Sequence, residues 1–270
     1  MELVVLTFLL AGIKMSKIRF ILFLLLFACT STKLSFEDQL NQKFEKGVEL
    51  FDKQKYSRAK DELEFIITNN PGSKMALTSQ YLLGESYYML KEFESAAFEF
   101  DKFARFSQEY DKVESARFRI CQCAVNMSNS FQKDQKSTLD AISRLQEFIE
   151  DYPNSKNFHR ANQEISSLRY KLARKEFQSA RLYLKLEEYD SALIYFNNIL
   201  SEYYDTEIID DVRISIIFLY LLQNKTDIAV SYLEEQKLKF VSGKKLSEAE
   251  NLIIKMKNGI GVSEYIRLYK

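Results

Sequence analysis

The sequence has very few residues that interrupt regular structure. It contains two prolines, Pro71 and Pro153, and seven glycines among 270 residues. Folds built from many strands need frequent turn residues, so this scarcity excludes them. Charged residues instead alternate with Leu, Ile, Phe and Tyr at intervals of three and four positions; in residues 189–200 the apolar side chains share one helical face. We therefore predict an all-α fold.

The residues that most enzymes and metal sites use are also scarce. His159 is the only histidine, at an expected helix start where a surface position is typical. Cys121 and Cys123 would point about 200° apart on a helix, so they cannot form a disulfide without distortion. A Cys-x-Cys pair without further Cys or His is a weak metal signal, so we interpret both as small buried residues. The sequence also lacks a glycine-rich phosphate loop and a nucleophile elbow, and we expect neither an enzyme nor a cofactor.

Neither sign of charge is in clear excess. The chain carries 38 basic and 38 acidic residues, and residues 29–270 carry 35 and 37. Nucleic-acid-binding domains have a marked basic excess, so no nucleic-acid partner is expected. The many carboxylates lie on mixed-charge helical faces, which is typical of a solvated surface.

The apolar run that ends at the first cysteine is short. Residues 20–28 are nine consecutive apolar residues, preceded by Lys14, Lys17 and Arg19. A membrane span needs about 20 apolar residues, whereas a basic front, a short apolar core and a small residue form a secretory signal peptide. Residues 26–29, Leu-Phe-Ala-Cys, resemble a lipobox, the bacterial signal in which the cysteine is acylated and begins the mature chain. We expect Cys29 to carry the lipid; an ordinary signal peptide or an uncleaved anchor is the alternative.

A second apolar stretch, residues 3–13, precedes the basic cluster. Signal peptides do not usually have two apolar cores, so we expect translation to start at Met15, which makes MSKIRF the charged front. A hairpin of two short apolar segments is the alternative interpretation.

Internal repetition is the strongest pattern in the chain. Five segments each have an alanine four residues before a large apolar residue: Ala59/Leu63, Ala96/Phe100, Ala141/Leu145, Ala192/Phe196 and Ala229/Leu233. Twelve residues before the alanine lie Gly47, Gly84 and Ala180, with the bulkier Ile217 in the last segment, and Pro71 and Pro153 lie twelve residues after it. Small residues let two helices approach closely, and stacked helix pairs build a core that no single pair could bury. The pattern resembles the tetratricopeptide repeat and predicts a solenoid of about five helix pairs.

The repeat spacing is irregular and indicates two insertions. Successive alanines are 37, 45, 51 and 37 residues apart, against an ideal of about 34. The first insertion, residues 128–137, is expected to be a polar loop. The second, residues 154–188, has no Pro or Gly and predicts one central helix of about 30 residues, roughly 45 Å long. We divide the chain into 1–28 (signal peptide), 29–36 (lipidated linker), 37–155 (N-terminal repeats), 156–245 (long helix and C-terminal repeats) and 246–270 (capping helix and tail).

With that helix included, the sequence resembles the BamD family, the tetratricopeptide lipoproteins of the outer-membrane β-barrel assembly machinery. The most specific part is residues 151–192, DYPNSKNFHRANQEISSLRYKLARKEFQSARLYLKLEEYDSA, and residues 98–103 resemble the family's second repeat. The matching positions are Tyr152, Pro153, Ser155, Ala161, Leu172, Ala173, Glu176, Ala180, Tyr183, Tyr189 and Ala192. Glu164 stands where the family usually has arginine, and Tyr204 replaces a proline.

The resemblance implies a binding protein on the inner leaflet of the outer membrane, facing the periplasm. Its partners would be the periplasmic domains of a BamA-like subunit, mainly through the C-terminal repeats, and unfolded outer-membrane proteins held by the N-terminal repeats. A generic tetratricopeptide scaffold lipoprotein of a pilus, secretion or cell-wall complex is the alternative function. Apolar residues at the C-terminus, Ile260, Val262, Tyr265, Ile266 and Leu268, indicate a further partner surface.

The first helix of each pair lines the concave side of such a solenoid, which points to candidate binding residues. An aromatic groove with mixed charge suits an extended peptide that ends in an aromatic residue. Several of these aromatic residues are alternatively part of the inter-helix core, because aromatic stripes at helical spacing are usually core. The candidates are Phe44, Val48, Phe51, Tyr81, Glu85, Tyr88 and Arg117.

Overall fold

The computed structural model describes residues 35–257, and this part of the chain is helical with no strand. The predicted signal peptide, the expected start at Met15, the expected lipid site Cys29 and the residues from 258 onward lie outside the described residues. The helices are α2 (Phe36–Asp52), α3 (Tyr56–Asn69), α4 (Lys74–Met89), α5 (Phe93–Phe106), α6 (Tyr110–Met127), α7 (Lys136–Asp151), α8 (Phe158–Lys185), α9 (Tyr189–Glu202), α10 (Ile209–Leu222), α11 (Thr226–Gln236), the 3-10 helix η1 (Lys237–Lys239) and α12 (Gly243–Lys257).

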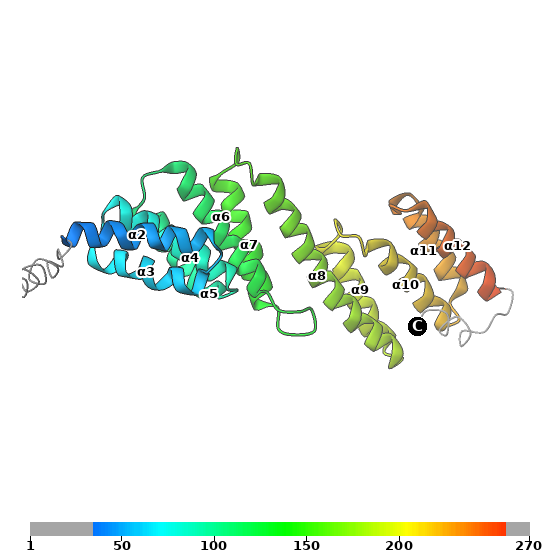
Figure 1. The fold of residues 1–270 in the computed structure, drawn as a ribbon. Helices are drawn as coiled ribbons and strands as arrows, with labels where there is room; N and C mark the ends of the chain where they lie inside the picture. Colours follow the sequence, from blue (N-terminus) through cyan, green and yellow to red (C-terminus); the bar gives the residue numbers. More distant parts are fainter. Residues whose placement is uncertain (1–34, 258–270) are drawn as a thin grey trace, which may run out of the picture.

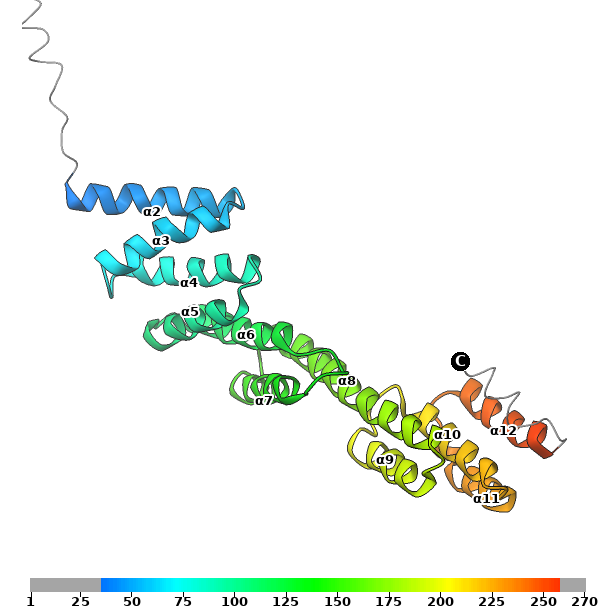
Figure 2. The same ribbon diagram turned by 90° about the horizontal axis from the view of Figure 1, so that it is seen from below.

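The helices pack as consecutive hairpins, and the molecule is elongated. α2 packs on α3, α4 on α5, α6 on α7, α8 on α9 and α10 on α11, and α12 covers the last pair. Figures 1 and 2 show the chain progressing from α2 at one end to α12 at the other. The buried apolar residues form a series of clusters along the chain, as expected for a solenoid in which each unit contacts its neighbours. The predicted all-α tetratricopeptide-like solenoid is confirmed.

The repeated alanines lie where the paired helices cross. All five alanines and their five large partners are buried, four of the partners completely. Gly47 and Gly84 face the same crossings: a Cβ added at Gly47 would meet Leu63, and one added at Gly84 would meet Phe100. The sequence pattern therefore identified the residues that set how closely each pair of helices packs.

Four of the five hairpins use the same tight turn. Gln54, Lys91, Glu187 and Asn224 each have a positive φ of 57–63° between the two helices of a pair. In each turn the next residue donates its backbone N–H to a carbonyl five residues back, as from Lys55 to Leu50 and from Glu92 to Tyr87. This is the Schellman arrangement that ends a helix, with a non-glycine residue in the left-handed position.

The third hairpin differs, and its loop is shorter than the sequence indicated. α6 ends at Met127 and α7 begins at Lys136. The last two residues of the predicted loop 128–137 are therefore the first two residues of α7. Cys121 of α6 belongs to the same buried cluster as Ala141 and Leu145 of α7. Its thiol donates to the Arg144 carbonyl at 3.2 Å.

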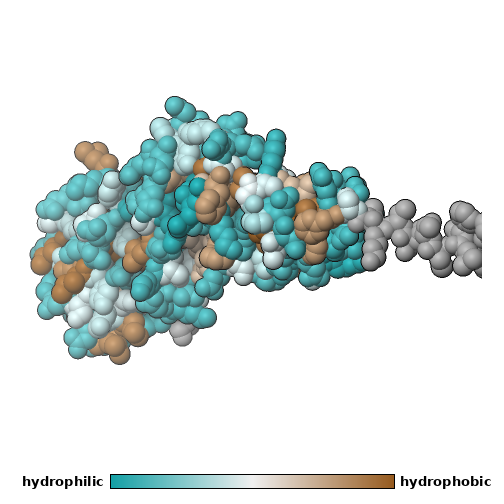
Figure 3. All heavy atoms as spheres, turned by 90° about the vertical axis from the view of Figure 1, so that its left-hand side faces the viewer, coloured by the Kyte–Doolittle hydropathy of each residue, from teal (hydrophilic) through white to brown (hydrophobic). Residues whose placement is uncertain are grey.

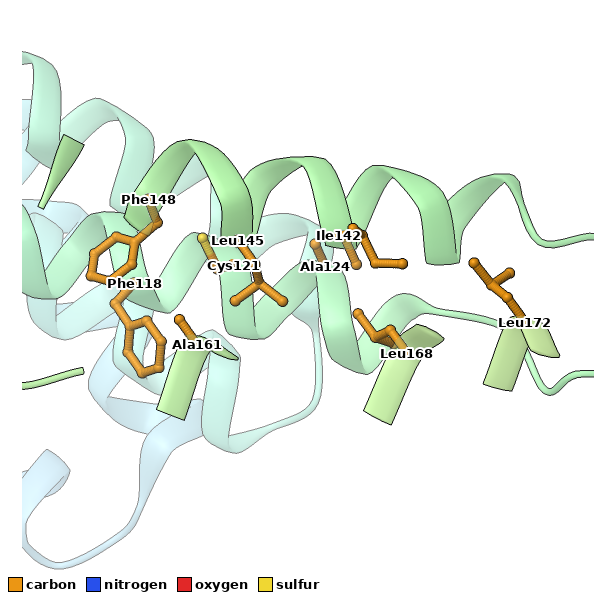
Figure 4. Close-up of a cluster of buried hydrophobic side chains, with 10 residues drawn as sticks. Phe118, Cys121, Ala124, Ile142, Leu145, Phe148, Ala161, Leu168 and Leu172 are labelled. Carbon is orange, nitrogen blue, oxygen red and sulfur yellow. The ribbon is translucent and has the colours of Figure 1, made fainter. Parts of the chain in front are cut away.

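The predicted central helix is present as α8, which has 28 residues and a length of about 42 Å. Its residues up to Leu172 pack on α6 and α7 through Ala161, Leu168 and Leu172 (Figure 4). Its C-terminal half packs on α9 and α10 through Ala173 and Ala180. α8 therefore belongs to two consecutive core clusters at once.

Candidate partner-binding groove

The first helices of the N-terminal pairs, α2, α4 and α6, carry the predicted binding residues. Phe44 and Val48 are half-buried on α2 and line a hollow of about 360 Å³ with Glu45, Glu49 and Asp52. Figure 3, which views the α2 end, shows small apolar patches among hydrophilic residues. Partly exposed apolar side chains rimmed by charge are available to an outside ligand, so Phe44 and Val48 remain candidates.

Phe51 and Tyr81 serve mainly to pack helices together. The ring of Phe51 meets that of Tyr56 edge-on at 5.4 Å, inside the α2–α3–α4 core. The ring of Tyr81 packs edge-on against Phe100 at 5.5 Å and Phe103 at 5.2 Å. Both rings are partly buried and pack between helices, which is the alternative that the sequence left open for these aromatic residues.

A charged and aromatic cluster joins α4 to α6. Glu85 is buried and accepts a hydrogen bond from Nε of Arg119 at 2.7 Å. The Arg119 guanidinium lies 4.7 Å from the ring centroid of Tyr88, in cation–π range. We call Tyr81, Glu85, Tyr88, Arg119, Gln122 and Asn126 the α4–α6 cluster.

The remaining contacts of the α4–α6 cluster hold its side chains in place. Arg119 also donates to Gln122 Oε1 at 3.0 Å, and Asn126 donates to the Tyr88 hydroxyl at 3.3 Å. The ring of Tyr88 meets Phe93 edge-on at 5.5 Å. Aromatic rings beside a fixed ion pair form a rigid surface with both apolar and charged character, which suits a peptide better than a chemical reaction.

The ion pair of this cluster controls its electrostatics. Burial lowers the pKa of Arg119, but the charge and hydrogen bond of Glu85 outweigh burial and leave the pKa above its ordinary value. Burial, with a further contribution from Glu85, raises the pKa of Tyr81. Arg119 and Tyr81 therefore each keep one protonation state across the neutral range.

Arg117 lies apart from the other predicted residues. It pairs with Asp101 of α5 at 3.1 Å and lines a pocket of about 380 Å³ between α6 and α7. Two residues along a helix point in nearly opposite directions, so Arg119 reaches α4 whereas Arg117 cannot. The sequence does contain a signal that points to Arg119 instead of Arg117. Arg119 lies 34 residues after Glu85, which is the length of one consensus repeat.

The family of the chain follows from the comparison with known families. Residues 36–229 match the model of the YfiO family, described as an outer membrane lipoprotein. The chain belongs to the YfiO family. This is the BamD-type family that the sequence resembled.

Membership of the YfiO family implies a role in outer-membrane protein assembly. A solved structure titled "Crystal Structure of the Apo Form of RapI" is similar at 12% identity and a TM-score of 0.35, covering 81% of this chain and 84% of that one. No curated protein sequence matches the chain significantly.

Other features of this YfiO-family chain bear on its chemistry. Cys121 and Cys123 are buried as expected, and burial raises the pKa of each thiol to about 12. Between residues 35 and 257, no cluster of three or more His, Cys, Asp or Glu residues could hold a metal ion. Across the same residues, no helix combines the length and apolarity needed to cross a bilayer.

Proposed function

We propose that this YfiO-family chain is a periplasm-facing, lipid-anchored subunit of the outer-membrane β-barrel assembly machinery. The single observation that carries the proposal is the family match over residues 36–229. The α4–α6 cluster and the hollow on α2 support it, because they offer binding surface without catalytic groups. In this function Cys29 carries the acyl anchor.

Two classes of ligand are expected on different parts of the solenoid. Unfolded outer-membrane proteins would bind the N-terminal repeats as extended segments ending in an aromatic residue. Phe44 and Val48 would contact apolar side chains, and Arg119 beside Tyr88 would receive the carboxylate and the terminal ring. The periplasmic domains of a BamA-like subunit would bind mainly the C-terminal repeats.

Photo-crosslinking tests the client site directly. A photoreactive amino acid placed at Tyr88 should crosslink to a peptide that ends in an aromatic residue, and the same group placed at Phe98 should not. Phe98 is an exposed aromatic residue on α5, which makes it a matched control. Val48→Ser should reduce crosslinking from Tyr88, while Ile194→Ser on α9 should leave it unchanged. Equal crosslinking from both positions would refute a groove-specific site.

Purification from native membranes separates this function from the alternative. The tagged full-length protein should bring down a large β-barrel subunit, and depletion should lower many outer-membrane proteins together. Recovery of only pilus, secretion or cell-wall components would instead favour the generic scaffold. Mass spectrometry of the N-terminal peptide tests acylation of Cys29 independently of either partner.

A further inference from the structure

The segment that connects α11 to α12 presents apolar side chains to solvent. Leu238, in η1, is 98% exposed, and Val241, two residues before α12, is 84% exposed. No other large apolar side chain between residues 35 and 257 is as exposed as these two. Neither contributes to the core clusters, so their apolar character has no role in holding this part of the fold together.

The exposure does not come from a loose backbone. The carboxylate of Asp210, a buried residue of α10, accepts the backbone N–H of Val241 at 3.0 Å and that of Ser242 at 2.8 Å. Arg213 pairs with Asp210 at 2.9 Å, and its guanidinium lies 5.7 Å from the ring of Phe240. Charge-assisted hydrogen bonds from a buried group therefore fix the backbone at Val241 and Ser242, where the Val241 side chain is exposed.

The same segment is strongly basic. Residues 237–245, KLKFVSGKK, contain four lysines and no acidic residue. Lys237 pairs with Glu250 at 3.1 Å and Lys245 with Asp211 at 2.7 Å. Lys239 and Lys244 are exposed and have no carboxylate partner within the described part of the chain. We call residues 237–245 the basic tip.

We propose that the basic tip is a second membrane contact that inserts Leu238 and Val241 into an anionic lipid surface. Exposed aliphatic side chains flanked by lysines match a lipid interface, where the apolar groups enter the acyl boundary and the ammonium groups stay at the phosphates. Protein interfaces are instead enriched in aromatic residues and arginine and depleted in lysine. The proposal rests on the lipid tether of the proposed function, because the tether brings the solenoid to the bilayer.

The tether also makes a weak contact sufficient. A lysine near an anionic leaflet strengthens binding about fivefold, so Lys239 and Lys244 together contribute about 25-fold. A free protein would gain little from such a tip, whereas a tethered one meets the surface at a high effective concentration. Because α2 and α12 lie at opposite ends of the molecule, contact at both ends would lay the solenoid along the membrane (Figure 1).

The test uses the full lipidated protein in vesicles and an environment-sensitive fluorophore attached to Leu238→Cys. Cys121 and Cys123 are buried and will not compete for the label. The fluorophore should shift to the blue in phosphatidylglycerol vesicles and be reached by a lipid-borne quencher, but not in phosphatidylcholine vesicles. A label at Ile194→Cys, an exposed apolar position on α9, should respond to neither.

Charge variants decide between lipid and other occupants. Lys239→Gln with Lys244→Gln should lower the inserted-to-free ratio at Leu238 about 25-fold, while Lys133→Gln with Lys136→Gln should leave it unchanged. If the fluorescence of the label at Leu238 is the same on anionic and on neutral vesicles, the proposal is wrong. It is also wrong if the label is protected only when a protein partner is added. Flotation with neutral vesicles reports the lipid anchor separately, so failure of the anchor and failure of the tip are distinguishable.

Discussion

Gly84 gives the sharpest quantitative test of the helix-crossing model. A Cβ at this position would lie 2.9 Å from Cε1 and 3.0 Å from Cδ1 of Phe100. Phe100 is completely buried, and the ring of Tyr81 packs against it at 5.5 Å, so the ring has no free space to enter. Gly84→Ala must therefore push α4 away from α5 or distort the ring.

The expected magnitude is the difference of two effects. Overpacking a core costs about 1–3 kcal/mol, and alanine in a helix interior is about 1 kcal/mol better than glycine. Gly84→Ala should thus lower the free energy of unfolding by about 1 kcal/mol. Gly47→Ala is the matched control: its Cβ would lie 3.1 Å from Cδ2 of Leu63, the end of a flexible side chain. The control should be neutral or mildly stabilising.

Urea denaturation followed by circular dichroism measures both variants. Phe100→Leu destabilises the protein by itself, but it removes the ring atoms that the new Cβ would meet. In that background Gly84→Ala should become neutral or stabilising. If Gly84→Ala stabilises the wild-type protein as much as Gly47→Ala does, the contact with Phe100 does not limit helix approach, and the reasoning is wrong.

Three further predictions address turns, buried charge and cooperativity. Lys91→Gly should stabilise the protein by about 0.5–1 kcal/mol in urea denaturation, because Lys91 has φ 63° in a turn where glycine avoids the left-handed penalty; a loss of stability would contradict this. Burial raises the pKa of Glu99 in the folded protein above its pKa in the unfolded chain. The contribution of Glu99 to stability is therefore complete below the unfolded pKa and is lost as pH rises through the folded pKa. Glu99→Gln should therefore raise the melting temperature at neutral pH but not below about pH 4, and equal effects at both would rule out burial of charge. Backbone amides in the middle of α8 should show the slowest hydrogen exchange, because two core clusters meet there, and exchange as fast as in α12 would argue against a shared helix.

The parts of the fold that depend on local pattern were predictable from sequence. The alanine and the large residue one turn later both face the partner helix, so their spacing identified the crossing in every unit. The absence of Pro and Gly from residues 154–188 likewise predicted one continuous helix. The turns were not predictable in the same way. Gln54, Lys91 and Glu187 have no sequence signature for a left-handed conformation, and the hairpin packing imposes it.

The candidate site was less predictable, because it depends on how each helix is rotated about its axis. Arg117 and Arg119 both lie on α6 beside apolar neighbours, and their composition does not distinguish them. Packing of α6 against α5 turns Arg117 toward Asp101 and leaves Arg119 to meet Glu85. The spacing between equivalent residues of successive repeats would identify Arg119 as the partner of Glu85 only if the length of the repeat were known. The long loop before α7 obscures that length.

Polar contacts between units explain how a repetitive core keeps one register. Glu85 joins α4 to α6, Lys171 of α8 donates to Ser128 Oγ after α6 at 2.6 Å, and Asp210 joins α10 to the start of α12. The apolar surfaces of successive units are alike, so they would tolerate a shifted stack, whereas a buried charge without its partner is costly. We infer that these contacts select the register. Because the Glu85 pair also belongs to the candidate groove, changes there would alter stacking and binding together, and Val48 is the better probe of binding alone.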